Sequence, residues 1–165
     1  SGFLTFFLAF VLREEPVAGL DDTVAIAVVA VAAWVGSTVG TTLGATTRAR
    51  SPDRTVLALL AMSAAIAALT AVFWGLVTVI LVAFAAGFGQ QLGRLSLDAV
   101  VQRDVPEHVR ASAFARSDTL LQLAWVLGGG LGIALPLVPP LGMGIAAVGL
   151  VGGLIVAQRV RPEPR

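Results

Sequence analysis

Thr55–Gly93, TVLALLAMSAAIAALTAVFWGLVTVILVAFAAGFGQQLG, carries no charged residue and is too long to form one membrane crossing. A helix needs about 20 apolar residues to cross the roughly 30 Å of hydrocarbon in a bilayer. Trp74 and Gly75 provide a natural turn near the middle of the stretch. The stretch therefore predicts two consecutive membrane-spanning helices joined by a tight connection.

Two further apolar runs predict the remaining complete spans. Thr23–Thr47 has the length of one crossing with some tilt. Thr119–Gln158 is again too long for one crossing, and the prolines at Pro136, Pro139 and Pro140 divide it into two.

The first residues of the chain form a shorter apolar run. Gly2–Leu12 is only about half as long as a crossing requires. It has neither the positive residues that precede the apolar core of a signal peptide nor the small-residue cleavage site that follows it. We interpret it as the second half of a sixth span, in a chain that is a fragment. A re-entrant or interfacial segment is the alternative.

The arginines are concentrated in alternate gaps between the apolar runs. Arg13 shares the first gap with four acidic residues, Glu14, Glu15, Asp21 and Asp22. The other ten lie in three regions: Arg48, Arg50 and Arg54; Arg94, Arg103, Arg110 and Arg116; and Arg159, Arg161 and Arg165. Because positive residues near the ends of spans remain in the cytoplasm, we expect these three regions inside and the acidic gap outside.

The expected fold is an all-α membrane protein, a bundle of five complete transmembrane helices plus one truncated N-terminal helix. A single domain, 1–165, would contain a partial span at 1–12, complete spans at 23–47, 55–73, 76–98, 114–135 and 141–157, and cytoplasmic loops at 48–54 and 99–113.

Composition argues against several other classes of protein. Hydrophobic residues make up 57% of the chain and charged residues 13%, against about 25% charged in soluble domains. With no cysteine and one histidine, His108 in an expected loop, we expect no catalytic residues, no enzyme activity, no metal site and no cofactor. Gly87-x-Gly89-x-x-x-Gly93 lacks the spacing of a dinucleotide fingerprint. The formal net charge of +1 does not indicate a nucleic-acid partner.

Two connecting segments resemble those of a transporter family. Gly44–Arg54, GATTRARSPDR, is similar to the second copy of the loop motif that major facilitator superfamily transporters keep between helices eight and nine. Val100–Arg116, VVQRDVPEHVRASAFAR, is similar to their connection between helices ten and eleven. The whole chain resembles the carboxy-terminal half of such a transporter, specifically of bacterial drug or siderophore exporters. The resemblance implies that the first residues correspond to the end of helix seven.

Glycines recur every four residues in three of the expected spans. They are Gly36, Gly40 and Gly44; Gly128 and Gly132; and Gly149 and Gly153. Because small residues allow membrane helices to approach closely, we interpret these positions as helix-packing sites.

Polar side chains and two tryptophans gather on three spans. Ser37, Thr38 and Thr41 lie within about 100° of one another on the span 23–47, and Trp34 shares their face. Polar groups in hydrocarbon are costly unless they face protein or water. We therefore predict a transport pathway that touches Trp34, Ser37, Thr38, Thr41, Gln90, Gln122 and Trp125. The alternative is that the hydroxyls bond to their own helix backbone and that the tryptophans simply pack.

Charges near the inner ends of two spans suggest a gate. We expect ion pairs among Arg94, Asp98, Arg116 and Asp118 to close the cytoplasmic side, because alternating access requires contacts that form in one state only. Solvated charges at the headgroup interface are the alternative. Between these spans, Asp104 and Pro106 predict the start of a short surface helix.

These observations and the resemblance predict the carboxy-terminal half of a secondary active transporter that moves a small molecule by alternating access. The resemblance alone implies efflux as the direction. The expected location is the bacterial cytoplasmic membrane, with a cytoplasmic C-terminus. The expected partners are the lipid bilayer, a missing N-terminal six-helix half and the substrate. A membrane scaffold or subunit, and a half-size transporter acting as a homodimer, are the alternatives.

Overall fold

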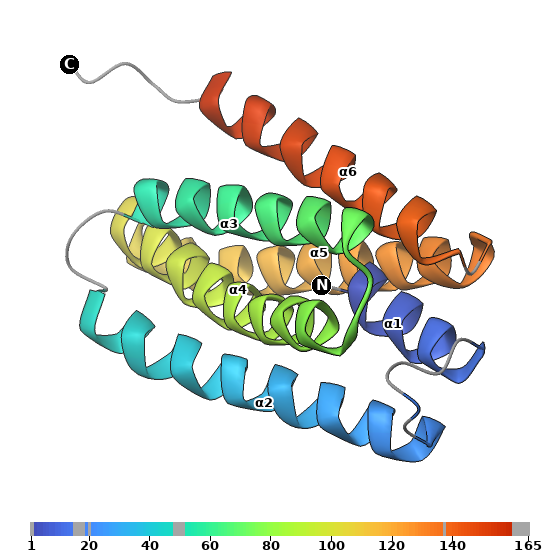
Figure 1. The fold of residues 1–165 in the computed structure, drawn as a ribbon. Helices are drawn as coiled ribbons and strands as arrows, with labels where there is room; N and C mark the ends of the chain where they lie inside the picture. Colours follow the sequence, from blue (N-terminus) through green and yellow to red (C-terminus); the bar gives the residue numbers. More distant parts are fainter. Residues whose placement is uncertain (1, 15–18, 20, 48–51, 137, 160–165) are drawn as a thin grey trace.

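The computed structural model describes residues 2–14, 19, 21–47, 52–136 and 138–159, and every regular element in these ranges is an α-helix (Figure 1). The helices are α1 (Gly2–Glu14), α2 (Asp22–Thr47), α3 (Pro52–Val72), α4 (Leu76–Asp104), α5 (Glu107–Ala134) and α6 (Pro139–Arg159). The all-α class is confirmed. Most of the expected loop 48–54 lies outside the described residues.

Among the residues that the structure describes, four helices are long and apolar enough to cross a membrane. These segments are Asp22–Ala45, Thr55–Val72, Leu76–Arg103 and Pro139–Arg159. At most 28% of the most apolar window of each is buried inside the bundle, so most of this apolar surface faces outward. The helix α5 has sufficient length, but polar residues such as Asp118 and Gln122 lower its hydropathy. The helix α1 has 13 residues and is too short.

Each of the first three helices packs against one of the last three. The strongest pairings are α2 with α4, α3 with α6 and α1 with α5, and α3 also packs on α4. Figure 1 shows α2 and α6 at opposite edges of the bundle, with the other helices between them.

The helix pairs α1–α5 and α2–α4 pack through the same kind of contact, a glycine of one helix against a phenylalanine carbonyl of the other. A Cβ atom added to Gly132 would lie 2.8 Å from the carbonyl oxygen of Phe3, and one added to Gly40 would lie 2.9 Å from that of Phe88. The two phenylalanines follow glycines, Gly2 and Gly87, which are themselves in close contact with a helix backbone.

The register of the two interfaces is also the same. Gly2 lies against the carbonyl of Trp125, and Gly87 lies against the carbonyl of Ala33. Trp125 is seven residues before Gly132, and Ala33 is seven residues before Gly40. The two interfaces therefore relate α1 to α4 and α2 to α5. We call the chain segments α1–α3 and α4–α6 the two three-helix units.

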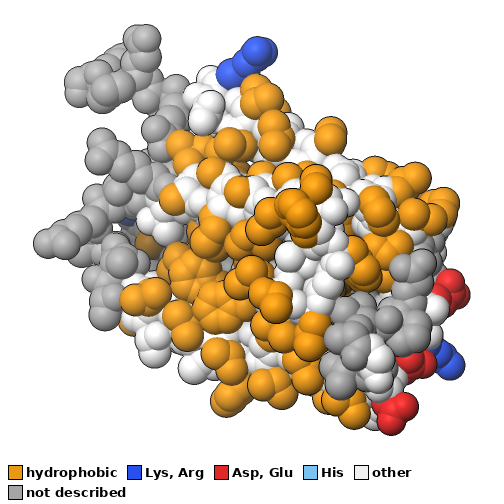
Figure 2. Space-filling view, in the orientation of Figure 1, with side chains coloured by type: hydrophobic (Ala, Val, Ile, Leu, Met, Phe, Trp, Pro, Cys, Tyr) orange, Lys and Arg blue, Asp and Glu red, His pale blue; other side chains and the backbone are white. Residues whose placement is uncertain are grey.

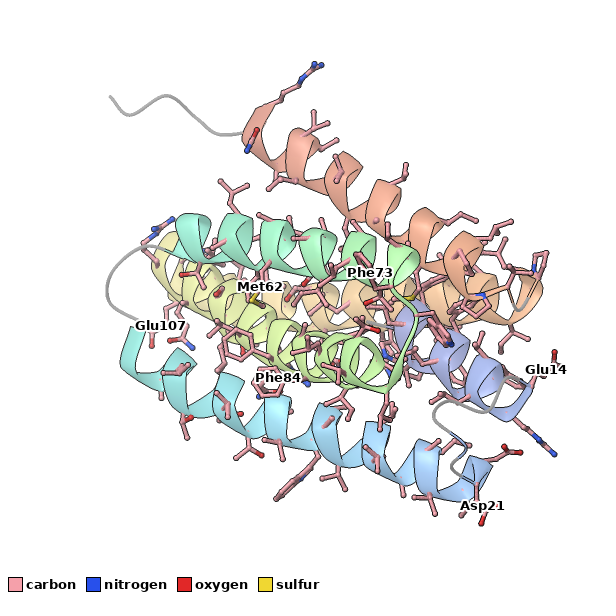
Figure 3. All side chains as sticks on the ribbon, in the orientation of Figure 1. Glu14, Asp21, Met62, Phe73, Phe84 and Glu107 are labelled. Atoms are coloured by element: carbon pink, nitrogen blue, oxygen red, sulfur yellow. The ribbon has the colours of Figure 1, made fainter. Side chains whose placement is uncertain are left out.

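The best-packed part of the bundle lies where α1 meets the first turns of α4. Phe7, Leu12 and Val79 are fully buried there, together with Met143 of α6. Acidic side chains gather on the surface at one end of the molecule (Figure 2). Glu14 and Asp21 lie at that end and Glu107 lies at the other (Figure 3), so the charged connections sit at the two ends of an apolar bundle.

The structure corrects the expected loop at 99–113 and the expected cap at Asp104. The helix α4 continues to Asp104, and α5 begins at Glu107 with Pro106 as its N-cap residue. Val105 is extended, with φ −102° and ψ 126°, because proline disfavours helical geometry in the residue before it. No residue between 99 and 104 breaks a helix, so the separate surface helix is absent here and its residues belong to α4 and α5.

Candidate functional site

The tight turn at Pro106 sets the geometry of the candidate site. Because α4 and α5 run antiparallel from this turn, residues equally far from it along the chain lie at about the same height. Arg94 and Asp118 are each twelve residues from Pro106, and Gln90 and Gln122 are each sixteen residues from it. At 1.5 Å per residue, the first pair lies about 18 Å from the turn and the second about 6 Å further along the helices.

The first of these pairs forms an ion pair. The Nη2 atom of Arg94 donates a hydrogen bond to Oδ1 of Asp118 over 3.1 Å. The two side chains remain 58% and 64% exposed, so solvent screens their attraction. Asp98 and Arg116, the other two expected gating residues, form no ion pair within the described ranges.

A cavity of about 680 Å³ lies beside this ion pair, between α1, α3, α4 and α5, and Leu150 of α6 also lines it. Its polar lining comes from six side chains and its aromatic lining from two. They are Thr5, Ser63, Gln90, Arg94, Asp118 and Gln122, with Phe3 and Trp125. The cavity thus lies between the two three-helix units, since α1 and α3 belong to the first and α4 and α5 to the second.

The glutamines of the cavity have unused hydrogen-bonding groups. Gln90 and Gln122 are both exposed in the bundle, and neither forms a side-chain hydrogen bond to any residue that the structure describes. Each amide offers two N–H donors and one carbonyl acceptor. The cavity can therefore bind a polar molecule or water through both amides without first breaking an internal bond.

Trp125 lines the cavity and packs against Phe6 of α1, which is not one of the lining residues. The ring of Trp125 meets the edge of Phe6 with the centroids 5.3 Å apart and an interplanar angle of 64°. This is a favourable aromatic arrangement that holds the indole in place. The sequence alone does not point to Phe6, because its contact with Trp125 depends on α1 packing against α5.

The expected pathway residues of α2 lie elsewhere. Trp34 is 70% exposed, and neither it nor Ser37, Thr38 or Thr41 lines the cavity. The hydroxyl of Thr38 donates to the Trp34 carbonyl over 3.0 Å, and that of Thr41 donates to the Ser37 carbonyl over 3.0 Å. These are the backbone bonds that the alternative interpretation expected. Of the expected pathway residues, Gln90, Gln122 and Trp125 line the cavity, whereas those of α2 do not.

The expected packing glycines of α2 lie against α4. Added Cβ atoms at Gly36 and Gly40 would meet the backbone carbonyls of Phe84 and Phe88, and one at Gly44 would meet the side chains of Leu92 and Leu95. Figure 3 shows Phe84 on the side of α4 that faces α2. Gly128 and Gly132 lie against Phe3 of α1 in the corresponding way. Within the described ranges, no group of three or more His, Cys, Asp and Glu side chains is placed to hold a metal ion.

Comparison with known proteins identifies relatives but no family. No family model matches the chain, and no solved structure matches it. An uncharacterized protein of Mycobacterium leprae is 32% identical over 159 residues, which cover 96% of this chain and 27% of the relative. Uncharacterized proteins from two strains of Mycobacterium tuberculosis are 61% identical over 33 residues, 20% of this chain and 6% of theirs. Nearly the whole of this chain is therefore similar to the Mycobacterium leprae protein, but it spans only about a quarter of that protein's length.

Proposed function

We propose that this chain is the carboxy-terminal six-helix half of a secondary active transporter of the major facilitator type. It would move a small molecule out of a bacterial cell by alternating access. The observation that carries the proposal is the repeated glycine–phenylalanine interface, which relates α1–α3 to α4–α6. Three crossings reverse the chain direction, so the second unit would be inverted relative to the first. Halves of this transporter type contain such nested inverted repeats.

The proposal counts α5 as a fifth complete span. Its polar residues Asp118 and Gln122 line the cavity and are exposed in the isolated bundle. Polar groups at membrane depth are tolerated when they face protein or water, so the proposal requires that this side of α5 faces the solute pathway. The short α1, which ends at Glu14 on the proposed outer side, would then form the outer part of a further span. The position of the cavity between the two units supports a solute site, since transporters of this kind bind substrate at the repeat interface.

The orientation follows from charge. The arginine-rich connections and the C-terminus would lie in the cytoplasm, and the end with Glu14 and Asp21 would lie outside. The helix α4 has 29 residues, or about 43 Å, which exceeds the roughly 30 Å hydrocarbon thickness. Its inner turns would therefore project from the bilayer, with the Arg94–Asp118 pair near the inner boundary. In that position the pair would act as a cytoplasmic gate that opens when α4 and α5 separate.

The proposed partners are the bilayer, the amino-terminal six-helix half and the substrate, with no nucleic acid. The Mycobacterium leprae relative is almost four times as long as the matched region, which leaves room for another half in one polypeptide. The exposed face of α2 with Trp34 and Thr41 would then face that half across the solute pathway.

Thiol accessibility in the protein at its natural full length tests the proposal. Gln122→Cys and Thr41→Cys are expected to react with a membrane-impermeant maleimide, because a pathway brings water to both positions. Val148→Cys is the matched control: it is 75% exposed in the isolated bundle but would face lipid, where a thiolate does not form. Unreactive cysteines at both pathway positions, under all conditions that shift the conformation, would refute the transport pathway.

A further inference from the structure

The cavity between α1, α3, α4 and α5 has a balanced charge. Among its described lining residues, Arg94 and Asp118 are the only ionised side chains, and they neutralise each other. A ligand with a net charge would find no counter-charge there. An unpaired charge next to hydrocarbon is strongly unfavourable, so the cavity favours a molecule that carries no charge.

The cavity also contains two hydrogen-bonding side chains that lie at about the same height along α4 and α5. Gln90 and Gln122 lie on facing helices, one helical turn from the ion pair, and both amides are unused within the described chain. A ligand that enters without donors and acceptors would leave these amides without the water that solvates them. Such desolvation costs free energy, so the ligand must carry amide or hydroxyl groups of its own.

The remaining walls are aromatic and aliphatic. Trp125 is held against Phe6, and Phe3 and Leu121 line the same space. A volume of about 680 Å³ falls within the usual range of roughly 300–1,000 Å³ for sites of drug-sized ligands. An aromatic ring can stack on or meet the edge of Trp125 while its polar substituent reaches the glutamines.

We propose that this cavity is the substrate site of the transporter inferred above, and that it selects uncharged aromatic molecules carrying amide or hydroxyl groups. The inference rests on the proposed function and adds the substrate class. Gln90 and Gln122 bind the polar substituent, Trp125 binds the ring, and the neutral Arg94–Asp118 pair provides no site for an ionised group.

Three probes of one shape and different charge test the selectivity. They are 4-nitrobenzamide, 4-nitrobenzoate and 4-nitrobenzylammonium, whose nitro groups quench tryptophan fluorescence on contact. With the full-length protein in lipid nanodiscs, we expect the neutral amide to bind at least about tenfold more tightly than either ion. The quenching should disappear in Trp125→Phe and persist in Trp74→Phe, which changes the same residue type outside both the cavity and the proposed solute pathway.

Changes at Gln122 should alter the selectivity in a defined way. Gln122→Leu removes the amide at similar volume and should weaken binding of 4-nitrobenzamide by about tenfold. Gln122→Glu introduces a carboxylate and should shift the preference to 4-nitrobenzylammonium. Gln102→Glu is the control, because it makes the same chemical change at an exposed position of α4 outside the cavity.

The outcomes separate this inference from the transport proposal. Tighter binding of an ionic probe to the unmodified protein, equal binding of all three, or quenching that survives Trp125→Phe would each overturn the substrate class. Binding of none of the probes would also overturn it. In each of these cases a reactive cysteine in the Gln122→Cys protein would leave the water-filled pathway standing.

Discussion

At the residue scale, the contacts between α4 and α5 follow from their distance to one proline. Arg94 and Asp118 meet because each is twelve residues from Pro106, and the two cavity glutamines are each one turn beyond them. The hydroxyls of α2 follow a different rule. Thr38 and Thr41 satisfy their hydroxyls on the preceding turn of their own helix, which any helical serine or threonine can do. The hydroxyls of Thr38 and Thr41 therefore need no partner outside their own helix.

The ion pair should contribute little to stability. Both partners are more than half exposed, and exposed ion pairs contribute about 0.2–1 kcal/mol. We expect Asp118→Asn to lower the free energy of unfolding by less than about 1 kcal/mol, measured by denaturant-induced unfolding in detergent micelles. Asp98→Asn, which removes a carboxylate that has no described partner, should change it even less. A much larger loss for Asp118→Asn would show that the pair is a structural contact and remove the basis for a gate.

At the scale of helices, close approach depends on the missing side chains of a few glycines. The carbonyl of Phe84 occupies the space where a side chain of Gly36 would begin. Membrane helices gain little from the hydrophobic effect when they associate, so close packing provides much of the attraction. Gly144, Gly149 and Gly153 of α6, by contrast, have open space around them.

Two matched substitutions test this difference. Gly36→Leu must push α2 away from α4 and is expected to cost at least about 1–3 kcal/mol of unfolding free energy, the usual range for overpacking. Gly149→Leu meets no atom within 4 Å and should be neutral or slightly stabilising, because leucine is the better helix former. Both are measured by the same unfolding assay. Equal costs at the two positions would contradict the packing of α2 on α4.

At the scale of the whole molecule, the repeated interface and the ends of the bundle define its organisation. The two three-helix units meet through α1–α5 and α2–α4 in one register. The charged connections collect at opposite ends, with Asp21 at one end and Glu107 at the other (Figure 3). An apolar bundle with charged ends is the arrangement expected of a helical membrane domain.

Sidedness can be measured at these two ends. In intact spheroplasts, an impermeant maleimide is expected to label Asp21→Cys and to leave Glu107→Cys unlabelled, because arginine-rich connections stay in the cytoplasm. Both positions are exposed, so each should react once the membrane is opened, which serves as the control. Labelling of Glu107→Cys alone in intact spheroplasts would invert the proposed orientation.

The sequence by itself determined the helical class and the approximate bounds of the helices. Apolar runs such as Thr55–Gly93, divided at Trp74 and Gly75, leave helices as the only way to satisfy the backbone in lipid. It indicated that Gly36 and Gly40 pack, but it also named Gly149 and Gly153 as packing sites, and no atom lies within 4 Å of a Cβ added at either of these two. It did not indicate that α4 and α5 continue to a two-residue turn, because propensity alone separates an exposed helical turn from a loop poorly.

Only the tertiary structure decided which polar residues share a site. Gln90, Gln122 and Trp125 gather at one cavity while Trp34 and Thr41 face away from it. The periodicity of the sequence shows on which face of a helix a residue lies. It does not show which other helix packs against that face. The neighbour is set by the close approach of Gly40 to Phe88 and of Gly132 to Phe3, which are contacts between residues far apart in the chain. The shared register of these two interfaces, and the cavity between the units, exist only once those contacts form.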